Sequence, residues 1–335
     1  MITRIMDIDE NSLALSKEIL EGEGVVAFPT ETVYGLGADA RSEKAVQSIY
    51  QIKGRPSDNP LIVHIHKDFD LNSLVFDEMP YAKKLREAFL PGPLTLVYKS
   101  RGMVCKTVSC GLDTLAIRVP SHPGAQKFLR YVNMPIAAPS ANLSKHISPV
   151  SSAHVYEDLG GKIPLVLEGG QCSGGIESTV CDVTGEYPVI LRSGLVSAEM
   201  IREIAGRCET YIPRSGEQVR SPGMKYKHYA PKCKTFLFEE REVLQAVDKF
   251  AQLSALGKKA FILCEDGFKH FFPEKSVLNL GKSAKDMAAN LYKLLHEGEK
   301  SADCIIALVP ESREGIMAGV INRLTKACAE ETDET

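Results

Sequence analysis

The chain has 335 residues, of which 44% are hydrophobic and 25% are charged, a balance typical of a folded globular protein and a length that favours two domains. No apolar run approaches the roughly 20 residues that cross a bilayer, and the first ten residues are charged and polar rather than signal-like, so we expect a cytoplasmic protein. The formal net charge of −3 gives no global electrostatic reason to expect nucleic-acid binding.

The first 206 residues predict a domain of alternating helices and strands. Asp9 is a suitable N-cap for an amphipathic helix that ends in a breaker run at 22–24, and a second helical stretch lies near residues 45–52. Short apolar runs typical of buried strands occur at residues 25–28, 61–65, 94–98, 115–119, 135–138, 163–167, 178–183 and 189–191. So many strands among few helices indicate an α/β body with a large twisted mixed sheet rather than a simple parallel one.

Residues 207–233 are rich in Pro and Gly and lack a sustained period, so we interpret them as a linker. The segment carries six basic residues against two acidic ones, a local charge of +4 that is unusual for a passive spacer. We therefore predict a basic linker that acts as a lid. Residues 234–335 then alternate strands at 235–238, 260–264, 276–280 and 304–308 with helices at 242–256, 285–296 and 313–327. This pattern predicts a small, doubly wound, Rossmann-like α/β domain with an acidic tail.

The nine cysteines are an odd number and show no C-x-x-C spacing. Neither a disulfide framework nor a zinc site is indicated, and we predict no protein-bound metal. Free cysteine packs as a small apolar residue in a reducing compartment, so these thiols are expected to be buried or incidental.

Two glycine-rich stretches match the patterns of phosphate-binding loops only in part. Residues 35–40 match G-x-G-x-x-A, but the following helix is short and KGRP at 53–56 interrupts it, and no acidic residue ends the next strand. Residues 169–175 have the glycine density of a P-loop without its Lys-Ser/Thr. Any ATP bound by this chain must therefore be held in another way.

Two motifs early in the chain offer polar groups next to strands. PTETVYGLG at 29–37 places Thr30 and Glu31 at the end of a buried strand, where α/β folds keep ligand sites, although both side chains could simply cap a turn. KGRPSDNP at 53–60 holds Lys53 and Arg55 two residues apart in a loop stiffened by prolines. Such a pair suits phosphate oxygens, and a solvated surface loop is the alternative.

Two polar residues interrupt apolar strands. Arg118 lies within LAIRVP, where an unpaired guanidinium would be costly to bury, so it needs a partner. A substrate carboxylate and an internal ion pair are both open interpretations. His64 interrupts the strand at 61–65 and is either a satisfied core histidine or a site residue.

Three further segments carry weaker signals. Ser140 and Asn142 follow a short apolar strand and supply a hydroxyl and an amide two residues apart. Ser178 follows the glycine-rich turn at 169–175, whose backbone N–H groups could form an anion nest. Arg192 ends the last strand of this body and offers one more cation.

Taken in order, the segments PTETVYGLG, KGRPSDNPL, IRVP, APSAN, GGIESTV and ILRSG resemble the YrdC-like family over residues 10–206. SPGMKYKHYAP at 221–231, followed by a small α/β domain, resembles the long, two-domain form of that family. The resemblance implies a concave body with a positively lined cavity for ATP, L-threonine and bicarbonate. It also implies a nucleotidyltransferase that makes threonylcarbamoyl-AMP and pyrophosphate for the threonylcarbamoyladenosine modification of tRNA.

The resemblance also implies roles for single residues. Those that would surround L-threonine are Thr32, His64, Arg118, Ala138 and Ser178. Those that would contact ATP are Lys53, Arg55, Asn59, Thr114, Ser140, Asn142, Ser148, Arg192 and Tyr226. Lys53, Arg55 and Arg192 would be the catalytic cations, acting with Mg²⁺ on the developing phosphate charge. The sequence shows no carboxylate cluster for the metal, so we expect ATP phosphates and water to hold Mg²⁺.

Two other functions are compatible with parts of the sequence. The cationic cavity and the basic linker could hold an RNA backbone without catalysis, which predicts a steep salt dependence and no ATP consumption. A YrdC-like domain could also serve carbamoyl transfer in another pathway, but the chain lacks the acylphosphatase-like and zinc-finger segments expected there. The favoured interpretation implies tRNA and a downstream threonylcarbamoyl-transferase as partners, and no membrane.

Overall fold

The computed structural model describes residues 1–212 and 229–328 of the chain. The chain divides into two compact units: one comprises Met1–Ser144 and Ser148–Tyr226, and the other comprises Lys145–Ile147 and Lys227–Thr335. Most of the predicted linker at 207–233 lies outside the described ranges, so the predicted lid and its contact through Tyr226 stay predictions.

The first unit is built on one large mixed sheet. Its strands are β1 (Arg4–Asp7), β2 (Val26–Phe28), β3 (Gly35–Asp39), β4 (Ile62–His64), β5 (Leu94–Lys99), β6 (Thr114–Arg118), β7 (Ile136–Ala138), β8 (Leu165–Glu168), β9 (Thr179–Asp182), β10 (Val189–Arg192) and β11 (Glu209–Thr210). They lie in the order β1-β8-β2-β3-β7-β4-β6-β5-β9-β10-β11, with parallel and antiparallel pairs interleaved. The predicted mixed α/β sheet is confirmed, and β11 extends it into the start of the predicted linker.

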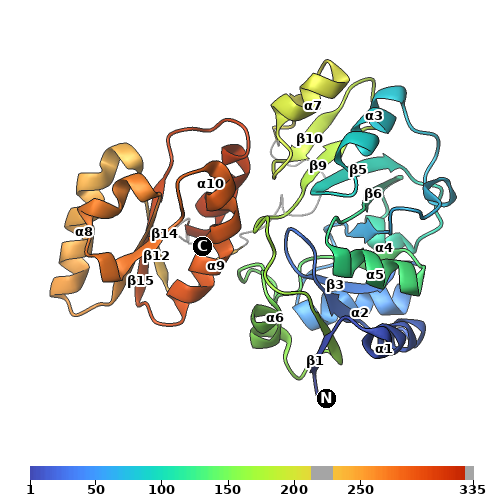
Figure 1. Ribbon diagram of the computed structural model, residues 1–335, viewed down its shortest axis with the longest axis horizontal. Helices are drawn as coiled ribbons and strands as arrows, with labels where there is room; N and C mark the ends of the chain where they lie inside the picture. Colours follow the sequence, from blue (N-terminus) through green and yellow to red (C-terminus); the bar gives the residue numbers. More distant parts are fainter. Residues whose placement is uncertain (213–228, 329–335) are drawn as a thin grey trace. The chain divides into compact units, whose positions relative to one another are not determined.

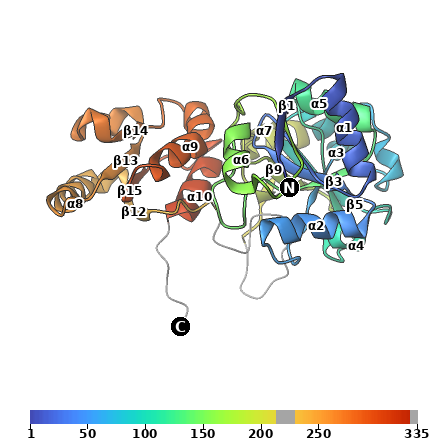
Figure 2. The same ribbon diagram turned by 90° about the horizontal axis from the view of Figure 1, so that it is seen from below.

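Helices cover this sheet (Figure 1). They are α1 (Glu10–Glu21), α2 (Glu43–Lys53), α3 (Pro80–Phe89), α4 (Lys106–Ser109), α5 (Pro123–Val132), α6 (Ser152–Leu159) and α7 (Ala198–Ala205), with a 3-10 turn at Leu71–Ser73. α1 and α5 lie side by side in both views (Figures 1 and 2). With β2, β7 and β8 they enclose a core that includes Leu20, Phe28, Phe128 and Leu165.

Local sequence signals account for several helix ends. Asp9 caps α1 as predicted, because its carboxylate accepts the N–H of Ser12 at 2.8 Å and the Ser12 hydroxyl accepts the N–H of Asp9 at 3.0 Å. α2 ends at Gly54, whose φ of 60° is a left-handed conformation that favours glycine. This end point matters for the site, because it fixes where Lys53 and the following loop leave the helix.

The sequence patterns missed strands β1, β3 and β11 and the helices α3 to α7, so the expectation of few helices in this unit is wrong. β3 contains Gly35 and Gly37, residues that are depleted in strands. The structure explains the glycines: a Cβ on Gly37 would lie 2.6 Å from Cγ2 of Ile136 and 2.9 Å from Cε1 of Phe28. Only glycine lets β3 pass this close to its neighbours. Residues 35–39 are therefore part of the sheet rather than a phosphate loop.

The second unit is a small parallel sheet with helices on both faces (Figure 1). Its strands β12 (Lys234–Glu239), β13 (Ala260–Cys264), β14 (Val277–Asn279) and β15 (Cys304–Val309) are ordered β12-β15-β13-β14. The helices are α8 (Val243–Ala255), α9 (Ala284–Glu299) and α10 (Met317–Cys328), with 3-10 turns at Glu240–Glu242, Asp266–Phe271 and Glu274–Ser276. Figure 2 shows the same unit from below, with α8 set apart from α9 and α10. Each strand and helix predicted here is present.

Two general features follow from the structure. In the part of the chain that it describes, no helix combines the length and the apolar character needed to cross a membrane. All nine cysteines lie in the described residues and none forms a disulfide, and Cys172, Cys181, Cys208, Cys264, Cys304 and Cys328 are buried, as expected for cysteines that pack as apolar residues.

Candidate active site

Strand register brings buried polar side chains from separate motifs into one row. His64 of β4 lies opposite Arg118 of β6, and Arg118 lies opposite Thr95 of β5. Val180 of β9 pairs with Thr95, and Arg192 of β10 pairs with Val180 beyond a local irregularity. Partner residues on neighbouring strands project from the same face of a sheet. The row therefore joins three of the predicted site residues, and it adds Thr95, which the sequence analysis did not single out.

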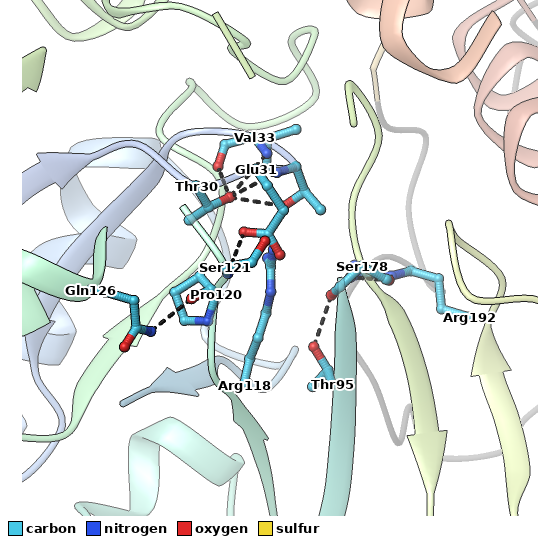
Figure 3. Close-up of polar contacts among 11 residues, drawn as sticks. Thr30, Glu31, Val33, Thr95, Arg118, Pro120, Ser121, Gln126, Ser178 and Arg192 are labelled. Atoms are coloured by element: carbon cyan, nitrogen blue, oxygen red, sulfur yellow. Dashed lines mark hydrogen bonds and ion pairs between the residues drawn. The ribbon is translucent and has the colours of Figure 1, made fainter. Parts of the chain in front are cut away.

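Arg118 forms the internal ion pair that was one of the two open interpretations. Its side chain is 4% exposed, and its Nη2 lies 2.9 Å from Oε1 of Glu31. The other carboxylate oxygen of Glu31 accepts the backbone N–H of Ser121 at 3.0 Å (Figure 3). The buried Nε of Arg118 has no hydrogen-bond partner among the described residues. An unpaired buried N–H costs about 1–3 kcal/mol, so this guanidinium still has capacity for a ligand oxygen.

Thr30 and Glu31 play different parts in the turn after β2. The Thr30 hydroxyl accepts the N–H groups of Thr32 and Val33 and donates to the carbonyl of Val33 at 2.6 Å, so Thr30 caps the turn. The Thr32 hydroxyl lies 2.9 Å from that of Thr30 and is fully buried. Glu31 does not cap the turn, because its carboxylate binds Arg118. The interpretation that both side chains only cap the turn is therefore correct for Thr30 and wrong for Glu31.

His64 is a neutral imidazole in this site. Its Nδ1 lies 3.1 Å from the carbonyl oxygen of Ile62, and because a carbonyl can only accept, Nδ1 carries the hydrogen. Burial, with the neighbouring charge of Arg118, lowers the pKa of His64 to about 3. Nε2 is then an unprotonated hydrogen-bond acceptor next to a guanidinium.

This neutral state predicts a pH effect on stability. The ordinary pKa of 6.5 applies in the unfolded chain and a pKa of about 3 in the folded one, so between these values unfolding takes up a proton. The free energy of unfolding should therefore fall as the pH drops below 6.5, by up to ~1.4 kcal/mol per pH unit from this group. His64→Gln should show a shallower acid slope in urea titrations at pH 7, 6 and 5. His270→Gln, at an exposed position, should keep the wild-type slope. Parallel slopes for wild type and His64→Gln would contradict this assignment.

Lys53 contacts the backbone of two other residues predicted to bind ATP, Ser140 and Asn142. It is the last residue of α2 and 4% exposed, and its Nζ donates to the backbone carbonyls of Ser140 and Asn142 at 2.5 Å each. Burial, with the charge of Arg55 nearby, lowers the pKa of Lys53 well below its ordinary value. A bound anion would favour the charged form again. The ammonium thus links the end of α2 to the loop after β7.

The loop after Lys53 is buried at both ends and exposed at its tip. Arg55 donates from Nη2 to the carbonyl of Asn59 at 2.9 Å and lies 5.7 Å from the ring centre of Tyr50. The Asn59 side chain is fully buried, and neither atom of its amide has a hydrogen-bond partner in the described part of the chain. A buried amide without a partner is rare in a folded protein, so this side chain is available to a ligand or an ordered water. An open pocket of about 510 Å³ beside this loop is lined by Arg55, Gly54, Thr107 and residues of α2.

Ser178 is held from two sides. Its hydroxyl lies 2.8 Å from that of Thr95, and Arg192 donates to its carbonyl from Nε at 3.1 Å and Nη2 at 2.9 Å (Figure 3). Gly194 permits this approach, since a Cβ there would lie 2.5 Å from the nitrogen of Thr179. Ser148 is also in this region, donating to Oε1 of Glu177 at 2.6 Å.

The predicted anion nest at residues 169–175 is wrong for four of its backbone N–H groups, which have partners within the protein. Gly174 donates to the carbonyl of Glu31, and Cys172 donates to that of Val150. Gly169 and Gly170 donate to the hydroxyl of Tyr34 and the carboxylate of Glu168. These four N–H groups therefore hold the turn in place and are not available to an anion, and the one of Gly174 fixes the backbone of Glu31.

The remaining predicted residues occupy two different places. Ala138 is buried in β7 opposite Ile62, so it projects from the face that carries His64. Thr114 begins β6 on the face of Arg118, but four residues of strand place it about 13 Å away. Among the described residues, no group of three acidic, histidine or cysteine side chains is arranged to hold a metal ion.

Comparison with known proteins identifies the family of the chain and agrees with its fold. Residues 18–194 match the model of the Sua5_yciO_yrdC family, described as telomere recombination, and the chain belongs to this family. Residues 196–329 match the model described as the threonylcarbamoyl-AMP synthase C-terminal domain. The two models together cover both units.

Relatives extend over the whole chain. A threonylcarbamoyl-AMP synthase of Pyrococcus abyssi is 38% identical, covering 96% of this chain and 95% of the relative. One of Bacillus subtilis is also 38% identical, covering 97% and 95%. The crystal structure of P. abyssi Sua5 complexed with L-threonine is similar with a TM-score of 0.88 and 37% identity, over 98% of this chain and 97% of that one. The predicted two-domain form of the family is thereby confirmed.

Proposed function

We propose that this chain condenses L-threonine, bicarbonate and ATP to threonylcarbamoyl-AMP and pyrophosphate. The observation that carries the proposal is Arg118, a buried guanidinium paired with Glu31 that still has an unpaired Nε–H, on the same sheet face as the neutral His64. A guanidinium matches a carboxylate and a neutral imidazole can accept an N–H, so the pair suits an α-amino acid. The full-length similarity to proteins named for this activity supports it.

In the proposed reaction, the threonine amine takes up the carbon of bicarbonate with loss of water to give a carbamate. A carbamate oxygen then attacks the α-phosphorus of ATP, and the bond from that phosphorus to the leaving pyrophosphate breaks. Arg118 would orient the carboxylate, and His64 Nε2 would accept a hydrogen bond from the amino acid. Lys53, Arg55 and Arg192 would balance the charge of the phosphates, so positioning and charge supply most of the catalysis.

Mg²⁺ is proposed to enter with ATP. When bound, it would neutralise charge on the phosphate oxygens and favour departure of pyrophosphate. The cationic side chains Lys53 and Arg55 suit the phosphates and not the metal, so phosphate oxygens and water would be its ligands. We further propose a cytoplasmic enzyme whose product passes to a threonylcarbamoyl-transferase acting on tRNA.

The direct test is pyrophosphate release from ATP with each substrate omitted in turn. The proposal expects release only when L-threonine and bicarbonate are both present, with a product whose mass equals threonylcarbamoyl-AMP. Release that ignores L-threonine would contradict it. RNA binding with a steep salt dependence and no ATP consumption would instead favour a binding module.

A further inference from the structure

Thr95 lies at the centre of the site without belonging to any of the motifs that define it. It is fully buried in β5, directly opposite Arg118. Its hydroxyl is 2.8 Å from the hydroxyl of Ser178, and Arg192 Nη2 lies 3.2 Å from that same Ser178 oxygen. Figure 3 shows Thr95 and Arg192 reaching Ser178 from different strands.

The hydrogens of these two hydroxyls can be assigned by accounting for donors and acceptors. Arg192 can only donate, so the Ser178 oxygen accepts from it. If Ser178 donated to Thr95, the Thr95 hydrogen would be left in a fully buried strand with no acceptor among the described residues. If Thr95 donates instead, the Ser178 oxygen accepts twice and the Ser178 hydrogen is left over. The second arrangement leaves the unused hydrogen on the residue predicted to meet the substrate.

We propose that Thr95 is a positioning residue that makes Ser178 a hydrogen-bond donor toward an oxygen of the bound amino acid. The inference rests on the proposed function and deepens it. Thr95 occupies one lone pair of the Ser178 oxygen and Arg192 occupies the other, so the hydrogen of the buried Ser178 hydroxyl has no acceptor among the described residues and is available to a ligand. Two accepted bonds, one from a cation, also polarise this hydroxyl and strengthen it as a donor.

A purely structural role for Thr95 makes a different prediction. Threonine is favoured in strands because it is β-branched, and valine shares that shape without the hydroxyl. Thr95→Val should therefore be silent if only packing matters. If Thr95 acts through Ser178, valine should impair the site and Thr95→Ser should restore it.

The experiment measures binding of L-threonine and of ATP by calorimetry in purified full-length variants. Thr95→Val should weaken L-threonine about five- to tenfold, the effect of one hydrogen bond, and should change ATP affinity less than twofold. Thr95→Ser should recover most of the loss. Thr184→Val removes a hydroxyl that bonds Asp182 in the loop after β9, and this control should change neither affinity.

A double-mutant cycle shows whether Thr95 acts through its partner. Thr95→Val combined with Ser178→Ala should bind L-threonine no more weakly than Ser178→Ala alone. Additive losses, or wild-type affinity in Thr95→Val, would overturn the inference. Thr95→Ala serves the same cycle if the valine variant folds poorly. Failure of the proposed function is separate, because it would appear as a wild-type protein without threonine-dependent pyrophosphate release.

Discussion

Replacing Arg118 with lysine should weaken L-threonine binding by tenfold or more while changing ATP affinity much less. The lysine ammonium can hold Glu31, but it cannot also present a planar fork to a carboxylate. Calorimetric titration of both ligands gives the comparison directly. Arg130→Lys is the matched control, since Arg130 pairs with Asp68 at the surface, where both side chains are more than half exposed.

Arg118→Ala should have the larger effect on folding. It leaves the carboxylate of Glu31, whose side chain is 11% exposed, without its cation, and breaking a buried ion pair in this way costs about 3–5 kcal/mol. Urea denaturation of the alanine variant should show this loss, and Arg130→Ala should lose less than about 1 kcal/mol. If Arg118→Lys keeps wild-type threonine affinity, the pair with Glu31 is purely structural and the carboxylate role is wrong.

Lys53→Met should slow pyrophosphate release roughly a hundredfold. The loss combines a missing charge-assisted contact to phosphate with loosening of the loop that carries Ser140 and Asn142. Stability should fall as well, because the backbone carbonyls of Ser140 and Asn142 lose a buried donor, and the free energy of unfolding should drop by about 1–3 kcal/mol. Single-turnover assays and urea titration on the same preparation measure both effects.

Lys44→Met is the control for Lys53, because the Lys44 side chain is 80% exposed and pairs with Glu23 at the surface. It should leave turnover and stability close to wild type. Comparing the activity of Lys53→Met with its folded fraction separates the role of Lys53 in the reaction from its role in folding. If activity in Lys53→Met falls only as far as the folded fraction does, the ammonium is a structural link and contributes nothing to the chemistry.

Much of the fold could be predicted because its signals are local. The cap at Asp9 and the apolar strands each depend on residues close together in the chain, and so do the strands and helices of the second unit. The missed strands include β1, which pairs along β8 far down the chain, and β3, whose glycines are needed only because Phe28 and Ile136 press against it. The short strand β11 and the helices α3 to α7 were not predicted either. A pattern that records a residue's own preference cannot report the size of its neighbours.

The residue types available at the site can be recognised in the sequence, but contacts between distant segments fix how they are combined. Arg118 could be identified as needing a partner, since burying a lone guanidinium is costly anywhere. That its partner is Glu31, 87 positions earlier, depends on the pairing of strands β4, β6 and β7. Thr95 carried no signal at all, because a threonine in a strand is ordinary until register sets it against Ser178. Hydrogen-bond partners and sheet faces are fixed by contacts between distant segments, which is why only the folded chain assigns them.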